Sequence, residues 1–169
     1  HDPGAIRAAM NAIVARPAIT SADLTRREVN CQALGHLLAC VATLPVAGVT
    51  FRKAPESAPP LVIAGVTVSV RPELELVVTS KDGQVRYGLL KLYLGKSHPL
   101  TDDAGGYVAT IVHEYAEKRF TGPQSVDRKH CLVFDAFQEK LFVAPSSHRQ
   151  RRKDIAAACE EIAIRWPSL

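Results

Sequence analysis

Two segments near the middle of the chain carry residues whose types and spacing could do chemistry. Glu73 and Glu75 lie two residues apart in the first segment, so in a strand both side chains point to the same face. The second segment carries Lys91. Carboxylates on neighbouring strands supply the oxygen ligands that Mg²⁺ prefers, and a lysine beside them can stabilise developing negative charge. This set is typical of metal-assisted hydrolysis of a phosphodiester.

The length of the turn between the two segments decides whether the lysine faces the carboxylates. Asp82-Gly83 is a strong turn signal. A three-residue turn over 81–83 places Glu73 opposite Lys91. A two-residue turn over 82–83 shifts the pairing by one residue and moves the lysine to the other face of the sheet. We expect the first register, and the second remains the alternative.

The elements that must position these residues follow from hydrophobic spacing and from turn residues. Residues 1–20 are expected to form a short helix and a loop, with a break at Pro17. The remaining segments predict helices at 24–44, 107–120 and 146–166, strands at 48–52, 61–70, 131–137 and 140–144, and a hairpin over 71–94. This order predicts an α/β fold, a three-layer sandwich with a central mixed β-sheet and the order α-β-β-β-α-β-β-α.

Composition limits the class of protein. The 169 residues predict one domain over 1–169. No apolar run reaches the roughly 18 residues that span a bilayer, so we expect no membrane partner. The cysteines lie in apolar segments without the spacing of a zinc or redox motif, which predicts buried, reduced thiols in a cytoplasmic protein. They are Cys31, Cys40, Cys131 and Cys159.

The order of elements and the hairpin residues together resemble the PD-(D/E)XK nuclease superfamily, the restriction endonuclease-like fold. The resemblance covers about residues 24–145, with the helix at 146–166 beyond it. Arg71-Pro72-Glu73 looks like the Pro-Asp motif of the family, with Glu in place of Asp. Leu89-Leu90-Lys91 looks like the (D/E)-X-K motif, with Leu89 at the acidic position.

The resemblance implies a site for Mg²⁺. Glu73 and Glu75 would be the metal ligands, and Lys91 would assist the attacking water. Glu28 or Gln32 on the helix at 24–44 would support the site. Three interpretations stay open, because one expected carboxylate is missing: charge partners on a solvated face, a site that binds without cleaving, and an active metal site.

A basic run opens the last predicted helix. Positive charge in the first turns of a helix opposes the helix dipole, which indicates a use such as contact with phosphates. A solvated basic face is the alternative. The net charge of +4 permits a nucleic acid partner without requiring one. The candidate nucleic-acid contacts are His148, Arg149, Arg151, Arg152 and Lys153.

Two further groups invite a functional interpretation. His113 and Glu117 are four residues apart and share a helix face, so they could coordinate a metal, but a surface pair is expected. Asp102 and Asp103 precede the predicted helix 107–120 and are expected to cap it, with a carboxylate lent to a site at the sheet edge as the alternative.

The sequence thus predicts a nuclease-fold protein with an incomplete active site. It would bind nucleic acid, with weak or absent Mg²⁺-dependent cleavage of phosphodiester bonds. The alternative is a non-catalytic module that binds a protein partner or a second copy of itself, for instance in a bacterial defence or mobile-element system. Analogy to the family alone motivates that setting.

Overall fold

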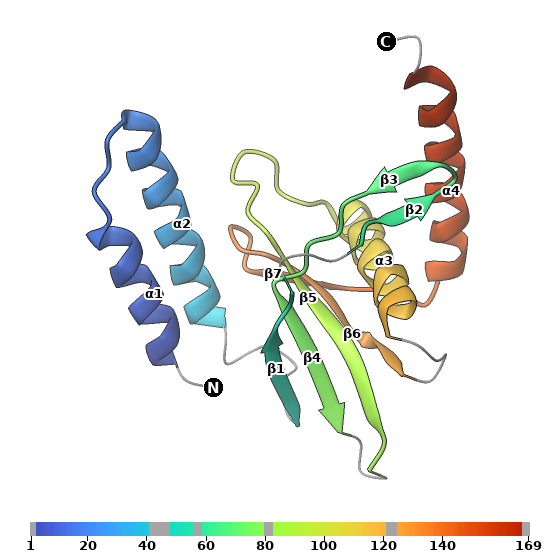
Figure 1. Cartoon of the computed structure of the whole chain (residues 1–169), viewed down its shortest axis with the longest axis horizontal. Helices are drawn as coiled ribbons and strands as arrows, with labels where there is room; N and C mark the ends of the chain where they lie inside the picture. The colour runs from blue at the N-terminus through green and yellow to red at the C-terminus, as the bar shows by residue number, and fades with distance from the viewer. Residues whose placement is uncertain (1–2, 41–47, 56–58, 80–82, 121–124, 167–169) are drawn as a thin grey trace.

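A five-stranded mixed sheet forms the centre of the protein in a computed structural model (Figure 1) that describes residues 3–40, 48–55, 59–79, 83–120 and 125–166. The strand order is β1-β4-β5-β6-β7. The strands are β1 (Val49–Lys53), β4 (Leu74–Thr79), β5 (Val85–Tyr93), β6 (Val126–Asp135) and β7 (Lys140–Val143). The helices are α1 (Pro3–Ala15), α2 (Ser21–Cys40), α3 (Asp102–Arg119) and α4 (His148–Arg165). The α/β class and the mixed sheet are therefore confirmed.

A single crossover makes the sheet mixed. β5 and β6 are parallel, whereas the other neighbouring strands are antiparallel. Parallel neighbours need a long connection, and here α3 supplies it. Within the part of the chain that the structure describes, the order around this crossover is β1, β4, β5, α3, β6, β7 and α4.

The two faces of the sheet have separate cores. On one face, Leu89 and Val133 pack with Val112 of α3. On the other face, Leu76 and Leu90 pack with residues that include Ala33 of α2. Neighbouring residues of β5 therefore serve opposite cores, as the two-residue period of a strand requires. Glu73, Glu75 and Lys91 lie on the α3 face with Leu89. Glu75 pairs with Leu89, Lys91 follows Leu89 by two residues in the same strand, and Glu73 stands opposite Lys91.

The predicted strand 61–70 is wrong. The segment forms a hairpin of β2 (Leu61–Ile63) and β3 (Val66–Val68), which make a separate two-stranded sheet. Ala64 has a φ of 45° and Gly65 a φ of 82°, so both residues adopt the left-handed region that tight hairpin turns use. In Figure 1 this hairpin crosses α4, and both of its strands contact that helix.

The helix before β6 begins earlier than predicted. α3 starts at Asp102, and Thr101 is its N-cap, with its side chain accepting a hydrogen bond from the Ala104 amide. The two aspartates thus lie in the first turn and are not the caps. Gly105 lies inside the helix. The position requires a glycine, because a Cβ there would sit 2.3 Å from the ring of Phe142. Close packing on β7 thus explains a glycine that the sequence suggested belonged to a loop.

The N-terminal part of α4 packs on α3, and the C-terminal part is exposed. Ile155 and Cys159 contact the core on the α3 face. Ile162 and Ile164 are 46% and 78% exposed. Ser147 is the N-cap residue, but its side chain makes no capping hydrogen bond.

Other boundaries agree with expectation in part. α1 ends before Pro17, as predicted, and β1 matches the strand at 48–52 within one residue. The predicted end of the helix at 41–44 lies outside the described residues, and so does the side chain of Cys40. Cys31, Cys131 and Cys159 are free thiols. Among the described helices, none combines the length and the apolar character needed to cross a membrane.

Candidate functional site

The hairpin β4–β5 has the expected register. Thr79 pairs with Val85 and Glu75 pairs with Leu89, so Glu73 stands opposite Lys91 just before β4 begins. Gly83 has a φ of 78°, which fits a glycine at the end of a three-residue turn. The two-residue alternative is therefore wrong, and Lys91 shares a face with both glutamates.

Both carboxylate oxygens of Glu73 are used within the hairpin. Lys91 Nζ lies 2.5 Å from Glu73 Oε1. The backbone amide of Leu92 donates to Glu73 Oε2, also at 2.5 Å. The side chains of Lys91 and Glu73 are 30% and 39% exposed, so the pair lies at the margin of the core. The lysine thus neutralises the carboxylate that the resemblance makes a metal ligand.

Glu75 has a cationic partner from another element. Arg119, the last residue of α3, donates from its terminal guanidinium nitrogen to Glu75 Oε1. The side chains of Arg119 and Glu75 are only 22% and 15% exposed. Arg119 could not be recognised from the sequence as a partner of Glu75, because the two residues are far apart in the chain and meet only through the α3 crossover.

The position of the missing carboxylate is part of the hydrophobic core. Leu89 is 0% exposed and packs with Val112 and Cys131, among others. A carboxylate at this place would have no water around it, and an ion beside it would face apolar side chains. The residues present therefore do not fit the two-carboxylate cradle for Mg²⁺ that the resemblance implies.

Glu28 and Gln32 are separated from this hairpin by the sheet. Both are exposed on α2, the helix that packs on the opposite face. Gln32 Oε1 accepts a hydrogen bond from Lys96 Nζ at 3.0 Å. The structure thus brings Glu73 together with Lys91 and leaves the two α2 residues elsewhere.

The basic run of α4 is largely used inside the molecule. Arg151 forms an ion pair with Asp103 at 2.9 Å, and its guanidinium lies 4.3 Å from the centre of the Tyr107 ring. Gly106 leaves room for this arginine, because a Cβ there would lie 3.2 Å from Arg151 Cζ. Acidic and aromatic groups of α3 thus offset the unfavourable place of Arg151 in the dipole of α4.

Arg152 makes a second charged contact between the helices. It pairs with Glu117 at 2.6 Å and with Glu114 at 3.6 Å, and it contacts Nδ1 of His113 at 3.0 Å. An arginine can only donate, so Nδ1 accepts and the neutral ring carries its proton on Nε2. Nε2 lies 3.4 Å from Glu117 Oε1. These three residues hold α4 on α3.

His113 pairs with Glu117 as expected, but the expected surface position is wrong because His113 is buried. Only 4% of the residue is exposed. Burial lowers the pKa of His113 to about 4, with Arg152 adding to this effect and Glu117 opposing it. The ring of His148 lies against it edge-on, at 4.9 Å between centres. His148, a candidate nucleic-acid contact, therefore packs at the same helix interface.

Two of the five basic candidates remain directed to solvent. Arg149 and Lys153 are exposed on α4, and neither has an ion pair with the residues that the structure describes. They are the candidates that could reach a partner outside the molecule.

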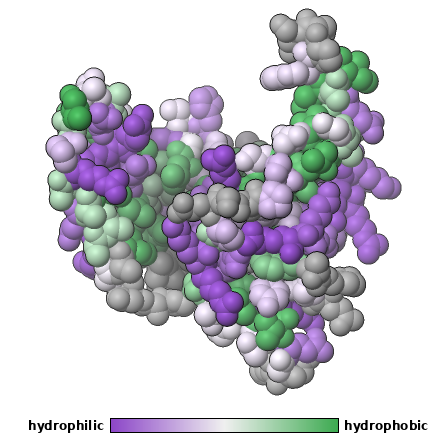
Figure 2. Space-filling view, in the orientation of Figure 1, coloured by the Kyte–Doolittle hydropathy of each residue, from purple (hydrophilic) through white to green (hydrophobic). Residues whose placement is uncertain are grey.

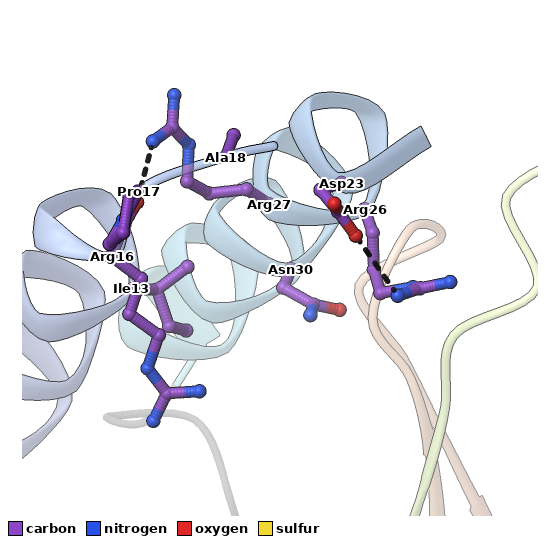
Figure 3. Close-up of a pocket in the computed structure, with 8 residues that line it drawn as sticks. All are labelled: Ile13, Arg16, Pro17, Ala18, Asp23, Arg26, Arg27 and Asn30. Carbon is purple, nitrogen blue, oxygen red and sulfur yellow. Dashed lines mark hydrogen bonds and ion pairs between the residues drawn. The ribbon is translucent and has the colours of Figure 1, made fainter. Parts of the chain in front are cut away.

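A second group of arginines surrounds a hollow of about 210 Å³ where α1 meets α2 (Figure 3). Arg26 points toward Asp23, at 3.5 Å. Arg27 points away from Asp23 and donates to the main-chain carbonyls of Val14 and Arg16, at 3.2 and 3.1 Å. Their guanidinium groups do not converge in Figure 3, and only that of Arg27 joins α2 to the end of α1.

Among the described residues, no group of three or more histidines, cysteines and acidic residues could hold a metal ion. Comparison with protein-family models, with curated proteins and with solved structures found no match for this chain.

Proposed function

We propose that this protein is a non-cleaving relative of the PD-(D/E)XK nucleases that works by binding a protein partner. One observation carries the proposal: Leu89, at the place of the family's second carboxylate, is fully buried in the core on the α3 face. A ligand for Mg²⁺ cannot be supplied there without opening that core.

The order of elements supports the relationship to the family. An antiparallel set β1, β4 and β5, followed by α3 and a parallel β6, has the order that the resemblance implies. The hairpin β2–β3 is an addition between β1 and β4. The register that places Glu73 opposite Lys91 adds a second point of agreement.

The charge pairs support the loss of cleavage. Lys91 holds Glu73, and Arg119 holds Glu75, so each carboxylate already has a cation of the chain beside it. A metal ion would have to displace both Lys91 and Arg119. It would then still lack the carboxylate that the family carries at the position of Leu89. The last turns of α4 support the second half of the proposal, because Ile162, Ile164 and Trp166 leave large apolar side chains exposed there on more than one side of the helix.

A cleavage assay tests the proposal. The wild type and Glu73→Gln are incubated with labelled single- and double-stranded DNA and RNA, with Mg²⁺ or Mn²⁺. Neither protein is expected to cleave above the level of a mock purification. Cleavage by the wild type that disappears in Glu73→Gln would show a working metal site and would overturn the proposal.

Nucleic-acid binding without cleavage is the second candidate function. The exposed Arg149 and Lys153, with the net charge of +4, favour it. The test is fluorescence anisotropy of labelled DNA and RNA at two salt concentrations. Binding that weakens with salt and is lost in Arg149→Glu would support this candidate, and binding unchanged by that substitution would contradict it.

A further inference from the structure

One face of α4 is free of the rest of the molecule. Figure 1 shows α4 at the outer edge of the structure, with α3 on its inner side and the β2–β3 hairpin crossing it. The opposite side carries a stripe of exposed residues spaced four, four, three and four apart, so they share a helix face. The stripe consists of Arg149, Lys153, Ala157, Glu160 and Ile164.

The charges of this stripe are divided between its ends. Arg149 and Lys153 lie in the N-terminal half, where they repel each other across one turn and oppose the helix dipole. Glu160 lies in the C-terminal half, with no basic residue three or four positions away. None of the three has an ion pair with the described residues. A partner molecule could supply an opposite charge to each of these three residues.

The spacing makes the stripe complementary to itself. Lys153 and Glu160 lie equally far on either side of the point between Ala156 and Ala157. Arg149 and Ile164 do as well. An antiparallel copy of the helix, centred on this point, would bring opposite charges together and would place small residues at the closest approach.

We propose that the partner of this protein is a second copy of the same chain, held through an antiparallel pair of α4 helices. Lys153 lies against Glu160 of the partner subunit, and Glu160 lies against Lys153 of the partner subunit. This inference rests on the proposed function, because it names the partner that the non-catalytic protein binds.

Apolar contact completes the interface. Ile164 is 78% exposed in the single chain. In the antiparallel arrangement it meets Arg149 of the partner subunit, whose methylene groups can cover it while the guanidinium stays in water. Figure 2 shows hydrophobic residues over the C-terminal half of α4. Ile162, also exposed, is not part of the stripe, because it lines a hollow with Gly65 and Val66 of the β2–β3 hairpin.

The charge pattern favours a protein over a nucleic acid at this face. Glu160 stands in the stripe itself, and a phosphate backbone that followed the stripe would be repelled there. A parallel pair of helices is also disfavoured, since it would place lysine on lysine and glutamate on glutamate.

Sedimentation velocity of the full chain over a range of concentrations tests the pairing. The wild type is expected to form a dimer that weakens with salt. Lys153→Glu and Glu160→Lys each replace two attractive contacts by two repulsive ones, so each is expected to raise the dimer dissociation constant by about tenfold or more. The double swap, Lys153→Glu with Glu160→Lys, is expected to restore the dimer.

A mixture of the two single variants gives a sharper result. In a mixed dimer both charge contacts are attractive again, so Lys153→Glu and Glu160→Lys are expected to associate with each other although neither forms a dimer alone. Lys129→Glu, at an exposed position on β6, is the control with the same change of net charge as Lys153→Glu and is expected to leave the dimer intact. Circular dichroism confirms that each variant is folded.

The outcomes separate this inference from the proposed function. A wild type that stays monomeric, or single variants that dimerise as well as the wild type, would overturn the inference and leave the proposed loss of cleavage standing. A monomeric wild type that binds DNA through Lys153 would also overturn it. Metal-dependent cleavage would overturn the proposed function whatever the oligomeric state.

Discussion

Lys91 and Glu73 form an ion pair across β4 and β5, with 2.5 Å between Nζ and Oε1. The pair joins Glu73, which the nuclease resemblance would make a metal ligand, to Lys91, which it would have assist the attacking water. The amide of Leu92 takes the second oxygen of the carboxylate. The hairpin therefore uses these side chains to fix its own geometry.

The hydrogen bond from Leu92 and the charge of Lys91 can be separated by substitution at Glu73. Glu73→Gln keeps an oxygen acceptor for the amide and removes the charge, so we expect a loss of about 0–1 kcal/mol, as for other partly exposed pairs. Glu73→Ala also removes the acceptor and is expected to cost more. Urea unfolding of the two variants measures the difference, and equal losses would contradict the role of the amide contact.

The pKa of His113 predicts how stability depends on pH. The unfolded chain takes up a proton near pH 6.5, whereas the folded protein resists protonation down to about pH 4. The stabilising effect of the neutral His113 on the free energy of unfolding is therefore complete above pH 6.5. It is lost as the pH falls toward 4, by up to about 1.4 kcal/mol per pH unit. Unfolding free energies at several pH values measure this slope.

His113→Gln is expected to flatten that slope between pH 6.5 and 4. His98→Gln is the matched control, since His98 is exposed in the loop before α3. If both variants keep the slope of the wild type, the buried histidine is not its source.

Gly105 is required by the contact between α3 and β7. We expect Gly105→Ala to destabilise the protein by about 1–3 kcal/mol, because the added methyl group meets the Phe142 ring at 2.3 Å. Gly35→Ala in α2 is the control, where a Cβ meets only Met10 Cε at 4.0 Å. Alanine is the better helix former, so that variant is expected to gain up to about 1 kcal/mol. Thermal or urea unfolding distinguishes the two signs.

Arg152 and Arg149 are expected to differ although they lie in the same basic run. Arg152→Met leaves Glu117 and the buried His113 without their donor, which predicts a loss of about 1–3 kcal/mol. Arg149→Met removes an exposed charge and is expected to stay within about 0.5 kcal/mol of the wild type. Equal losses in urea unfolding would show that the contact between α3 and α4 is not held by Arg152.

The sequence predicted local features of the fold best. The turn signal at Asp82-Gly83 and the strand alternation favoured the register that places Glu73 opposite Lys91 and left a two-residue turn as the alternative, because register in a hairpin depends on nearby residues. The turn at Ala64-Gly65 was missed, since only glycine signals it and the alanine also has a positive φ. The length of the β-branched run at 61–70 then suggested one strand.

Tertiary contacts account for what the sequence did not predict. The ion pair between Arg119 and Glu75 depends on the path of α3 across the sheet, which no local pattern encodes. The same holds for Arg151 and Arg152, whose partners lie on α3. The basic residues at the start of α4 suggested a contact with nucleic acid. In the structure, acidic residues of α3 form ion pairs with two of them.

Calorimetric titration of Mn²⁺ into the metal-free wild type tests whether Glu73 and Glu75 can hold a metal ion. Glu73→Gln combined with Glu75→Gln is the control that lacks both candidate ligands. The account predicts that the two proteins give the same heats, because Leu89 supplies no ligand and each glutamate is held by a cation of the chain. A stoichiometric binding isotherm in the wild type that is absent from the control would contradict it.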